Sequence, residues 1–203
     1  MEKQNENIDL ILASGNTHKA KEISALLPEN IHLKTLKDIG WDEDIEESGN
    51  SFIANAKIKA RTVALKTGHW VLADDSGLEC EALNGEPGVK SARYSGEKAG
   101  DQDNRNKLLQ AMKGKTNRKA RFVAVLVLSN GIKDFIFEGI CKGSITDEES
   151  GSGGFGYDPV FIPEGYEESF AMMKPGKKNK ISHRGKAMEA LNEWLSKHAD
   201  LLR

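Results

Sequence analysis

The chain has 203 residues, of which 38% are hydrophobic and 30% charged, and its formal net charge is -2. This composition is that of an ordinary globular protein with enough apolar residues for a large core, and it argues against intrinsic disorder. A slightly acidic chain lacks the positive surface with which proteins wrap a nucleic acid polymer. We therefore expect no nucleic acid partner, and any phosphate site should be a local cluster.

The cysteines and the first apolar run bear on the cellular compartment. Cys80 and Cys141 lie far apart in the sequence and lack the spacing of a zinc site, which favours a reduced, cytoplasmic protein. The apolar run at 8–13 is too short for a signal peptide or a membrane span, so we expect no membrane association. No linker-like tract divides the chain, and we predict a single domain over 1–203.

The first third of the chain predicts strand, turn, helix and strand. Residues 8–13 are a short Ile- and Leu-rich run typical of a buried strand, and helical spacing through Leu27 follows the turn at 14–16. Residues 32–36 predict a second strand. From 51 to 67, apolar residues recur every three or four positions, which predicts an amphipathic helix. Its opposite face is polar and consists of Asn55, Lys59, Thr62 and Lys66.

The rest of the chain predicts a hairpin and two more helices. A strand at 70–74 ends in an acidic pair, and 78–83 is a candidate partner strand. Helical spacing marks 101–113 and 184–202. Two long apolar runs flank Asn130-Gly131, a strong hairpin signal. Strand and helix alternation with one hairpin predicts an α/β fold with a mixed sheet.

Ligands of such sheets bind where strands end, and the stretch SGNTHK (14–19) stands between a predicted strand and helix. Ser14 or Asn16 can cap the helix, Gly15 allows close backbone approach, and Lys19 adds positive charge beside free backbone N–H groups. These features suit a triphosphate. The alternative is an ordinary helix cap with a solvated lysine, and the stretch matches neither a Walker loop nor GxGxxG.

Two acidic stretches favour a magnesium ion. The run at 42–52 precedes a helix, where acidic residues often complement the helix dipole, and DDSGL at 74–78 follows a strand. So many negative charges beside a phosphate site would repel the substrate unless a cation lay between the carboxylates and the phosphates. Mg²⁺ takes one or two carboxylates with phosphate oxygens and water. The DDSGL pattern does not match the DxDx[TV] of haloacid dehalogenase phosphatases.

Two further stretches have the chemistry of a nucleotide site. In GSGGFGYDPVF (151–161), glycines permit close approach while Phe155 and Tyr157 offer flat faces for stacking a base, unless they fold back onto the core. The basic run at 174–187 is either a solvated face or a binding segment. His183 and Arg184 there offer donors for phosphate or a base carbonyl, and nearby lysines can meet phosphates.

Six motifs in this order resemble the inosine triphosphate pyrophosphatase family, also called the XTP/dITP diphosphatase family. The likeness extends from about residue 8 to 195. The motifs are SGNxxK, FxxNAxxKA at 52–60, ADDSGL, PGVxSARYSG at 87–96, GxGGFGYDP and SHRGKA. The resemblance implies an elongated mixed β-sheet flanked by helices, with two lobes around a central cleft. It also implies a homodimer that uses Mg²⁺ to hydrolyse ITP, dITP and XTP to the monophosphate and pyrophosphate, which cleanses the nucleotide pool.

The resemblance also assigns roles to individual residues. Asp75 would be the proton acceptor and, with Glu47, a metal ligand, although Glu46 stands beside Glu47 and could replace it. Lys178 rests on its spacing from His183, and Lys177 or Lys180 could substitute. The substrate contacts implied are Ser14, Gly15, Asn16, Thr17, His18, Lys19, Lys59, Ser76, Phe155, Gly156, Tyr157, Asp158, Lys178, His183 and Arg184.

This chemistry is attack of water on the α-phosphorus, for which positioning and charge neutralisation suffice. A base pocket that presents hydrogen-bond donors accepts a 6-oxo group and rejects adenine, whose 6-amino group also donates. Two other hypotheses remain at this stage. One is a nucleotide-binding sensor that does not hydrolyse its ligand, and the other is a nucleotide pyrophosphatase with a different base preference.

Overall fold

The computed structural model describes residues 7–202, so the ends of the predicted domain, residues 1–6 and 203, lie outside the described part. The chain forms two compact units. Unit 1 comprises the residues up to Asp75 together with 125–138 and those from Ala187 onward; unit 2 comprises 76–124 and 139–186. Three strands and the last long helix contribute residues to both units.

The strands form one six-stranded sheet of order β2-β1-β3-β4-β5-β6. β1 pairs in parallel with β2 and β3, whereas β5 and β6 are antiparallel, so the predicted mixed sheet is confirmed. The bounds are β1 Ile8–Leu12, β2 Ile31–Thr35, β3 Val71–Cys80, β4 Lys119–Ser129, β5 Asp134–Ile145 and β6 Phe161–Pro163.

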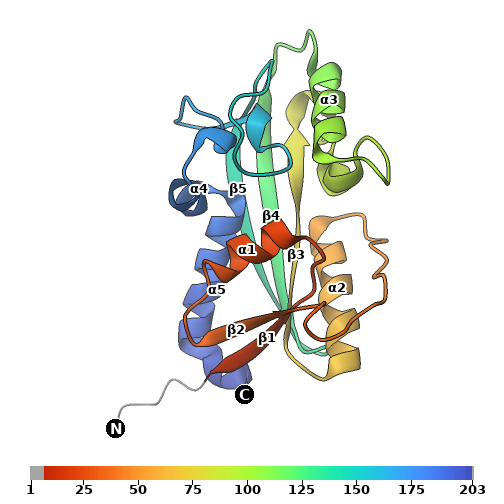
Figure 1. Cartoon of the computed structure of the whole chain (residues 1–203), viewed down its shortest axis with the longest axis vertical. Helices are drawn as coiled ribbons and strands as arrows, with labels where there is room; N and C mark the ends of the chain where they lie inside the picture. Colours follow the sequence, from red (N-terminus) through yellow and green to blue (C-terminus); the bar gives the residue numbers. More distant parts are fainter. Residues whose placement is uncertain (1–6, 203) are drawn as a thin grey trace. The chain divides into compact units, whose positions relative to one another are not determined.

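In the described part of the chain, five α-helices accompany the sheet, and Figure 1 shows α2 and α5 on either side of the strands of unit 1. Their bounds are α1 Thr17–Ser24, α2 Phe52–Thr67, α3 Asp101–Met112, α4 Pro175–Ile181 and α5 His183–His198. Short 3-10 helices cover 81–83, 88–93, 158–160, 170–172 and 199–202. The predicted helices at 51–67 and 101–113 are confirmed; α1 ends before Leu27, and the last helix ends at His198, where a 3-10 turn replaces it.

The acidic pair lies inside a strand and not at its end, so this part of the sequence prediction was wrong. β3 continues through Asp74 and Asp75 to Cys80, and no separate partner strand follows. The strand continues because Leu78 and Cys80 are fully buried in the core of unit 2. Both carboxylates therefore project from the middle of a long strand whose backbone is held by its neighbours.

Each unit has its own apolar core. In unit 1 the apolar side chains of β1 and of the part of β3 in this unit are buried, as are Val63 of α2 and Leu191 of α5. The core of unit 2 is rich in aromatic rings: Phe122 lies 4.7 Å from Phe161 between ring centroids, and Phe161 lies 5.2 Å from Phe170. Within residues 7–202, no helix is both long enough and apolar enough to span a membrane.

Candidate active site

The loop between β1 and α1 ends in a helix cap. Asn16 caps α1: its side-chain oxygen accepts hydrogen bonds from the N–H groups of His18 at 2.9 Å and Lys19 at 3.1 Å. Ser14 accepts the Asn16 N–H at 3.2 Å, so Asn16 and not Ser14 is the helix cap. Gly15, Asn16, Thr17 and His18 are exposed, which leaves this segment accessible to an anionic ligand.

Lys19 points from the first turn of α1 to the acidic pair of β3. Its Nζ lies 2.6 Å from Oδ1 of Asp74, a carboxylate with no solvent exposure. A buried carboxylate is stable only with a charged or hydrogen-bonding partner, so Asp74 fixes the position of Lys19. This pairing could not be predicted from the sequence, because the two residues are 55 positions apart.

Lys59 of α2 brings the two predicted metal ligands together in unit 1. Its Nζ donates to the backbone oxygen of Asp74 at 2.8 Å and lies 3.3 Å from Oε1 of Glu47 and 3.5 Å from Oδ1 of Asp75. The lysine is 7% exposed. The ammonium group of Lys59 therefore lies within 3.5 Å of carboxylate oxygens of both Glu47 and Asp75.

Asp75 has an unused coordination position. Its Oδ2 is buried and accepts no hydrogen bond. Burial raises the pKa of Asp75, and the charges of Lys59 and Lys19 offset this only in part. A buried carboxylate oxygen without a donor is costly unless a cation binds it, so the atom suits a metal ligand.

The donor set fits Mg²⁺ better than a metal that needs a full protein cage. Among residues 7–202, no group of three or more His, Cys, Asp or Glu side chains could hold a metal ion. Mg²⁺ is usually held by one or two carboxylates, with substrate phosphates and water completing its shell. Glu47, half-buried and in contact with Lys59, is better placed for this than Glu46, which is exposed.

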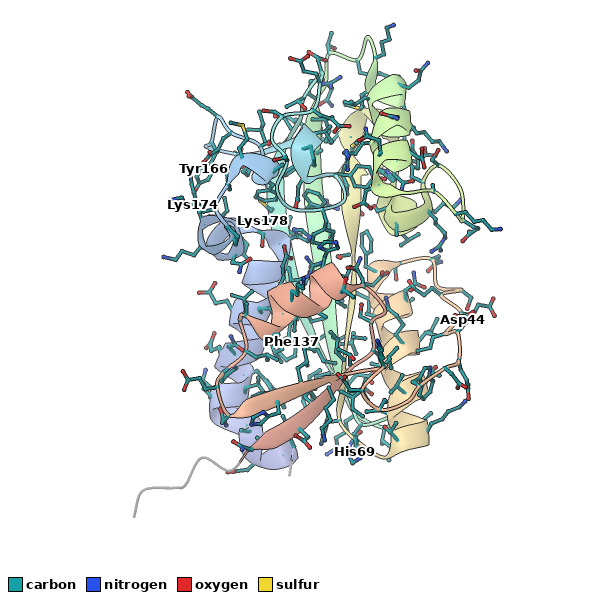
Figure 2. The ribbon with its side chains drawn as sticks, viewed as in Figure 1. Asp44, His69, Phe137, Tyr166, Lys174 and Lys178 are labelled. Atoms are coloured by element: carbon teal, nitrogen blue, oxygen red, sulfur yellow. The ribbon has the colours of Figure 1, made fainter. Side chains whose placement is uncertain are left out.

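The polar face of α2 is partly buried, which the predicted amphipathic pattern did not indicate. Asn55 has no exposure and Lys59 has 7%, whereas the apolar Ile53 of the same helix is 38% exposed. The reason is that these two polar residues face the acidic connection between β2 and α2, whose outer edge carries the exposed Asp44 (Figure 2). Polar residues at core positions are a signal of a functional site that helical periodicity alone hides.

In unit 2, Asp158 organises the glycine-rich loop. Its Oδ2 accepts hydrogen bonds from the N–H of Phe155 at 2.9 Å and from Nζ of Lys178 at 2.7 Å. Gly154 has a φ of +69°, and a Cβ there would lie 2.0 Å from the same oxygen. Only glycine therefore allows the loop to close on Asp158.

The two aromatic residues of this loop have different environments. Phe155 is half-buried, with Nζ of Lys178 at 5.0 Å and Cζ of Arg184 at 5.8 Å from its ring centroid. Tyr157 is 4% exposed, and its hydroxyl donates to the backbone oxygen of Ser91 at 2.8 Å. The Tyr157 ring belongs to the core of unit 2 and is not a stacking face, which leaves Phe155 for that role. The backbone of Gly156 is also engaged, since its N–H donates to Asp101 at 2.7 Å.

The start of α5 supplies buried donors. Arg184 is 1% exposed and donates from Nη2 to Oγ of Ser76 at 2.8 Å. His183 is 5% exposed and stacks on Phe122, with ring centroids 4.6 Å apart and planes 9° from parallel. The contact of Phe122 with His183 was not predicted, because Phe122 is only one of many apolar residues in its strand.

The basic run at 174–187 folds as α4 and the start of α5, and so is not simply a solvated face. Lys178 is buried, whereas Lys174 on the same segment is exposed (Figure 2). A Cβ at Gly185 would lie 1.7 Å from the backbone oxygen of Asn179, so the glycine after Arg184 lets the two helices meet closely.

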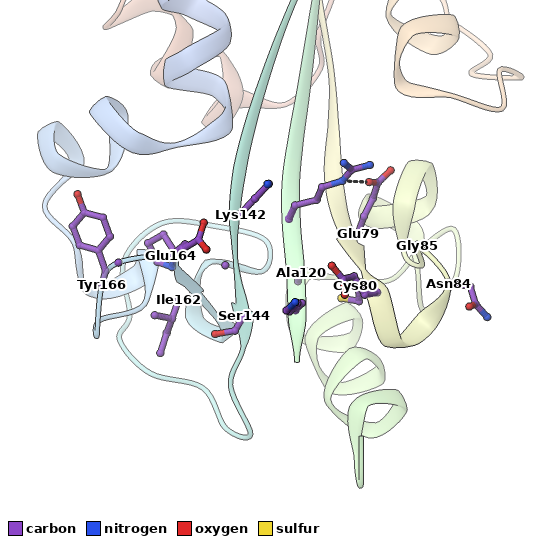
Figure 3. Close-up of a pocket in the computed structure, with 16 residues that line it drawn as sticks. Glu79, Cys80, Asn84, Gly85, Ala120, Lys142, Ser144, Ile162, Glu164 and Tyr166 are labelled. Carbon is purple, nitrogen blue, oxygen red and sulfur yellow. Dashed lines mark hydrogen bonds and ion pairs between the residues drawn. The ribbon is translucent and has the colours of Figure 1, made fainter. Parts of the chain in front are cut away.

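A large cavity of unit 2 contains none of the predicted site residues. Its volume is about 880 Å³, and Figure 3 shows it against strands β3 to β6. Charges of both signs line it, and Glu79 and Arg121 form an ion pair of 2.6 Å there. Because it has neither the carboxylate pair nor the glycine-rich loop, we assign the chemistry to the residues described above and not to this cavity.

Known proteins are similar to this chain in sequence and in fold. A family model described as Ham1 family matches residues 10–194. The chain belongs to the Ham1 family. It is 50% identical over 187 residues to a dITP/XTP pyrophosphatase of Flavobacterium psychrophilum, which covers 92% of this chain and 98% of that protein. A dITP/XTP pyrophosphatase of Bacillus licheniformis is 44% identical over 191 residues, with 92% and 97% covered.

Solved structures of Ham1 family members agree with the fold. The Staphylococcus aureus Ham1 protein aligns with a TM-score of 0.86 and 37% identity, covering 94% of this chain and 99% of that one. A HAM1 protein from Coxiella burnetii aligns with a TM-score of 0.87 and 40% identity, with the same coverage. The mixed sheet flanked by helices is therefore that of the family.

Proposed function

We propose that this protein is a nucleoside triphosphate pyrophosphatase, a hydrolase that converts ITP, dITP and XTP to the monophosphate and pyrophosphate. The observation that carries the proposal is the 50% identity to a dITP/XTP pyrophosphatase over nearly the full length of both chains. The acidic and basic cluster of unit 1 gives this likeness a chemical basis, because it holds two carboxylates around one positive charge. Removing non-standard purines from the nucleotide pool is the role that follows.

Unit 1 would bind the phosphate chain. The exposed segment 15–18 and the ammonium group of Lys19 suit a polyanion, and Lys59 can offset the charge that develops on departing pyrophosphate. Asp75, with a raised pKa and an unpaired oxygen, can accept the proton of the attacking water. Glu47 and Asp75 are the residues that would hold Mg²⁺, which when bound supplies electrostatic stabilisation of phosphate oxygens.

Unit 2 would bind the base. Phe155 offers a half-buried face for stacking, which adds affinity without distinguishing purines. His183 and Arg184 supply donors that match a 6-oxo group, and mismatched buried donors reject an amino group by about 10⁴-fold in favourable cases. Asp158 and Lys178 keep the loop in place, and Ser76 holds Arg184. Tyr157 would contribute through its backbone, since its ring lies in the core.

The compartment and assembly are also part of the proposal. Both cysteines are free and buried, and burial raises the pKa of Cys80 to about 12 and that of Cys141 to about 11. Inert, unpaired thiols favour a cytoplasmic protein. From the family resemblance we infer a homodimer, which sedimentation analysis of the purified protein tests directly.

A panel of triphosphates tests the proposed function. ITP, dITP, XTP, GTP, ATP and CTP are each assayed for pyrophosphate release with Mg²⁺ and with a chelator. We expect release from the first three with Mg²⁺ alone. Equal rates on ATP would contradict the base preference, and binding of ITP without turnover would make the protein a sensor.

A further inference from the structure

Asn55, at the start of α2, binds the acidic connection that carries Glu47. Its side chain has no solvent exposure, and its Oδ1 accepts the backbone N–H of Gly49 at 2.8 Å. Gly49 is separated from Glu47 by one residue. A hydrogen bond at this point therefore fixes the backbone next to the candidate metal ligand.

Packing at Gly49 confirms that the connection lies directly against the helix. A Cβ on this glycine would lie 2.6 Å from Oδ1 of Asn55 and 2.7 Å from Cβ of Ala54. No side chain larger than hydrogen fits without displacing the connection. The contact is thus close and specific.

The helix holds the connection at two points. Asn55 and Lys59 are four residues apart, so they lie one above the other on one helix face. Asn55 binds the backbone of Gly49, and Lys59 binds the carboxylate of Glu47 at 3.3 Å. The contact with Glu47 involves the ammonium group of Lys59, which substrate phosphates would attract. The hydrogen bond between Asn55 and Gly49 does not involve a charged group.

Burying the amide nitrogen of Asn55 costs free energy, and packing alone does not explain why it is buried. Its Nδ2 is buried and donates no hydrogen bond. An unsatisfied buried donor destabilises the fold, so an apolar residue would suit a purely structural position better. The part of the side chain that forms a contact here is the acceptor oxygen, which binds the Gly49 N–H.

We propose that Asn55 is a positioning residue that sets the place of the Glu47 carboxylate opposite Asp75 and so determines the affinity for the divalent cation. The inference rests on the proposed function, since it needs Glu47 and Asp75 to share an ion. Asn55 itself touches neither the ion nor the substrate in this account. Partners of this kind, which orient a metal ligand, typically change metal affinity about 10- to 100-fold when removed.

The test compares Asn55→Ala with a matched control, Asn104→Ala. Asn104 is also a buried helical asparagine, 3% exposed, whose Oδ1 accepts a loop N–H, that of Ser95, at 2.7 Å. It belongs to unit 2, whereas Lys59 and the carboxylates around it belong to unit 1. Both variants should lower Tm, so a structural role alone predicts the same behaviour for the two.

Two readouts separate positioning from stability. The first is the dissociation constant of Mn²⁺, measured without nucleotide from the free-ion electron paramagnetic resonance signal. We expect Asn55→Ala to weaken Mn²⁺ binding about tenfold and Asn104→Ala to change it less than twofold. The second is hydrogen exchange, in which the amide of Gly49 should exchange faster in Asn55→Ala only.

Gly49→Ala provides a second route that leaves the helix intact. It pushes the connection away from Asn55, so it should also weaken Mn²⁺ binding, even if Asn55→Ala fails to fold. If wild type binds Mn²⁺ and both variants bind it equally well, the inference is wrong while the proposed function stands. If wild type binds no Mn²⁺, the metal site of the proposed function fails, and the inference with it.

Discussion

The two clusters of candidate site residues differ in their balance of charge. In unit 1, three carboxylates surround two lysines: Lys19 pairs with Asp74, and Lys59 lies between Glu47 and Asp75. This cluster has one negative charge in excess, so it has room for a divalent cation. A divalent cation and two lysines are suited to binding phosphates, and they do not distinguish between the bases of different nucleotides.

The cluster of unit 2 has the opposite balance. Lys178 and Arg184 outnumber the single carboxylate of Asp158, and both cations lie within 6 Å of the Phe155 ring centroid. All three charged side chains are at most 5% exposed. A buried, pre-arranged set of donors beside an aromatic face suits a flat polar group. Because of this difference, we expect mutations in the two clusters to affect chemistry and base recognition separately.

The largest expected effect is on chemistry in unit 1. Asp75→Asn removes the charge of the group with the unpaired buried oxygen, and we expect kcat to fall by at least about 10³-fold for every substrate. Steady-state kinetics with ITP and XTP measures this. If kcat fell with only one of these substrates, Asp75 would act in base recognition. That result would contradict the separation of chemistry from base recognition.

The ion pair of unit 2 should dominate stability there. Lys178→Met leaves the carboxylate of Asp158 buried without its charged partner, which should lower the free energy of unfolding by about 3–5 kcal/mol. Denaturant unfolding measures the loss. Adding Asp158→Asn should restore most of the stability but not the KM for ITP. If neither the stability nor the KM for ITP recovers in the double variant, the ion pair has another structural role.

Recognition should depend on Phe155. Phe155→Ala should raise the KM for ITP about tenfold with kcat nearly unchanged, because stacking contributes to binding. Tyr166→Ala is the matched control, since the ring of Tyr166 also has a lysine at 4.9 Å but lies outside the candidate site. If the KM for ITP is unchanged in Phe155→Ala, Phe155 is not part of the base site.

The smallest effect is a pH dependence of stability without metal. Burial raises the pKa of Asp75, so ionising it costs more in the folded than in the unfolded chain. Stability from this group is present at low pH and is lost as the pH rises from the ordinary aspartate range through the raised pKa. In chelator at pH 8, Asp75→Asn should therefore melt about 2–4 °C above wild type. A lower Tm than wild type would show that the Lys59 contact outweighs burial.

Periodicity predicted most of the fold because it depends on apolar residues at regular spacing. The helix at 51–67 and the hairpin around Asn130-Gly131 are examples. The prediction failed where polar groups are buried by distant partners. Asp74 is buried within a strand with Lys19 as its charged partner, and a single sequence does not show that contact.

The candidate site was predicted as a set of motifs, but not as a set of contacts. The glycine-rich stretch indicated close approach, yet only the structure shows that Tyr157 turns into the core while Phe155 stays half-exposed. β6 and α4 were missed because one has three residues and the other lies within a run of lysines. Asn55 was read as part of a polar helix face, although it is fully buried.

The site of bond cleavage tests the central claim most directly. Hydrolysis of dITP with Mg²⁺ in ¹⁸O-labelled water should yield unlabelled pyrophosphate and deoxyinosine monophosphate that carries one ¹⁸O, with far slower turnover of dATP. Label in pyrophosphate, release of orthophosphate, or equal turnover of dATP would contradict the account.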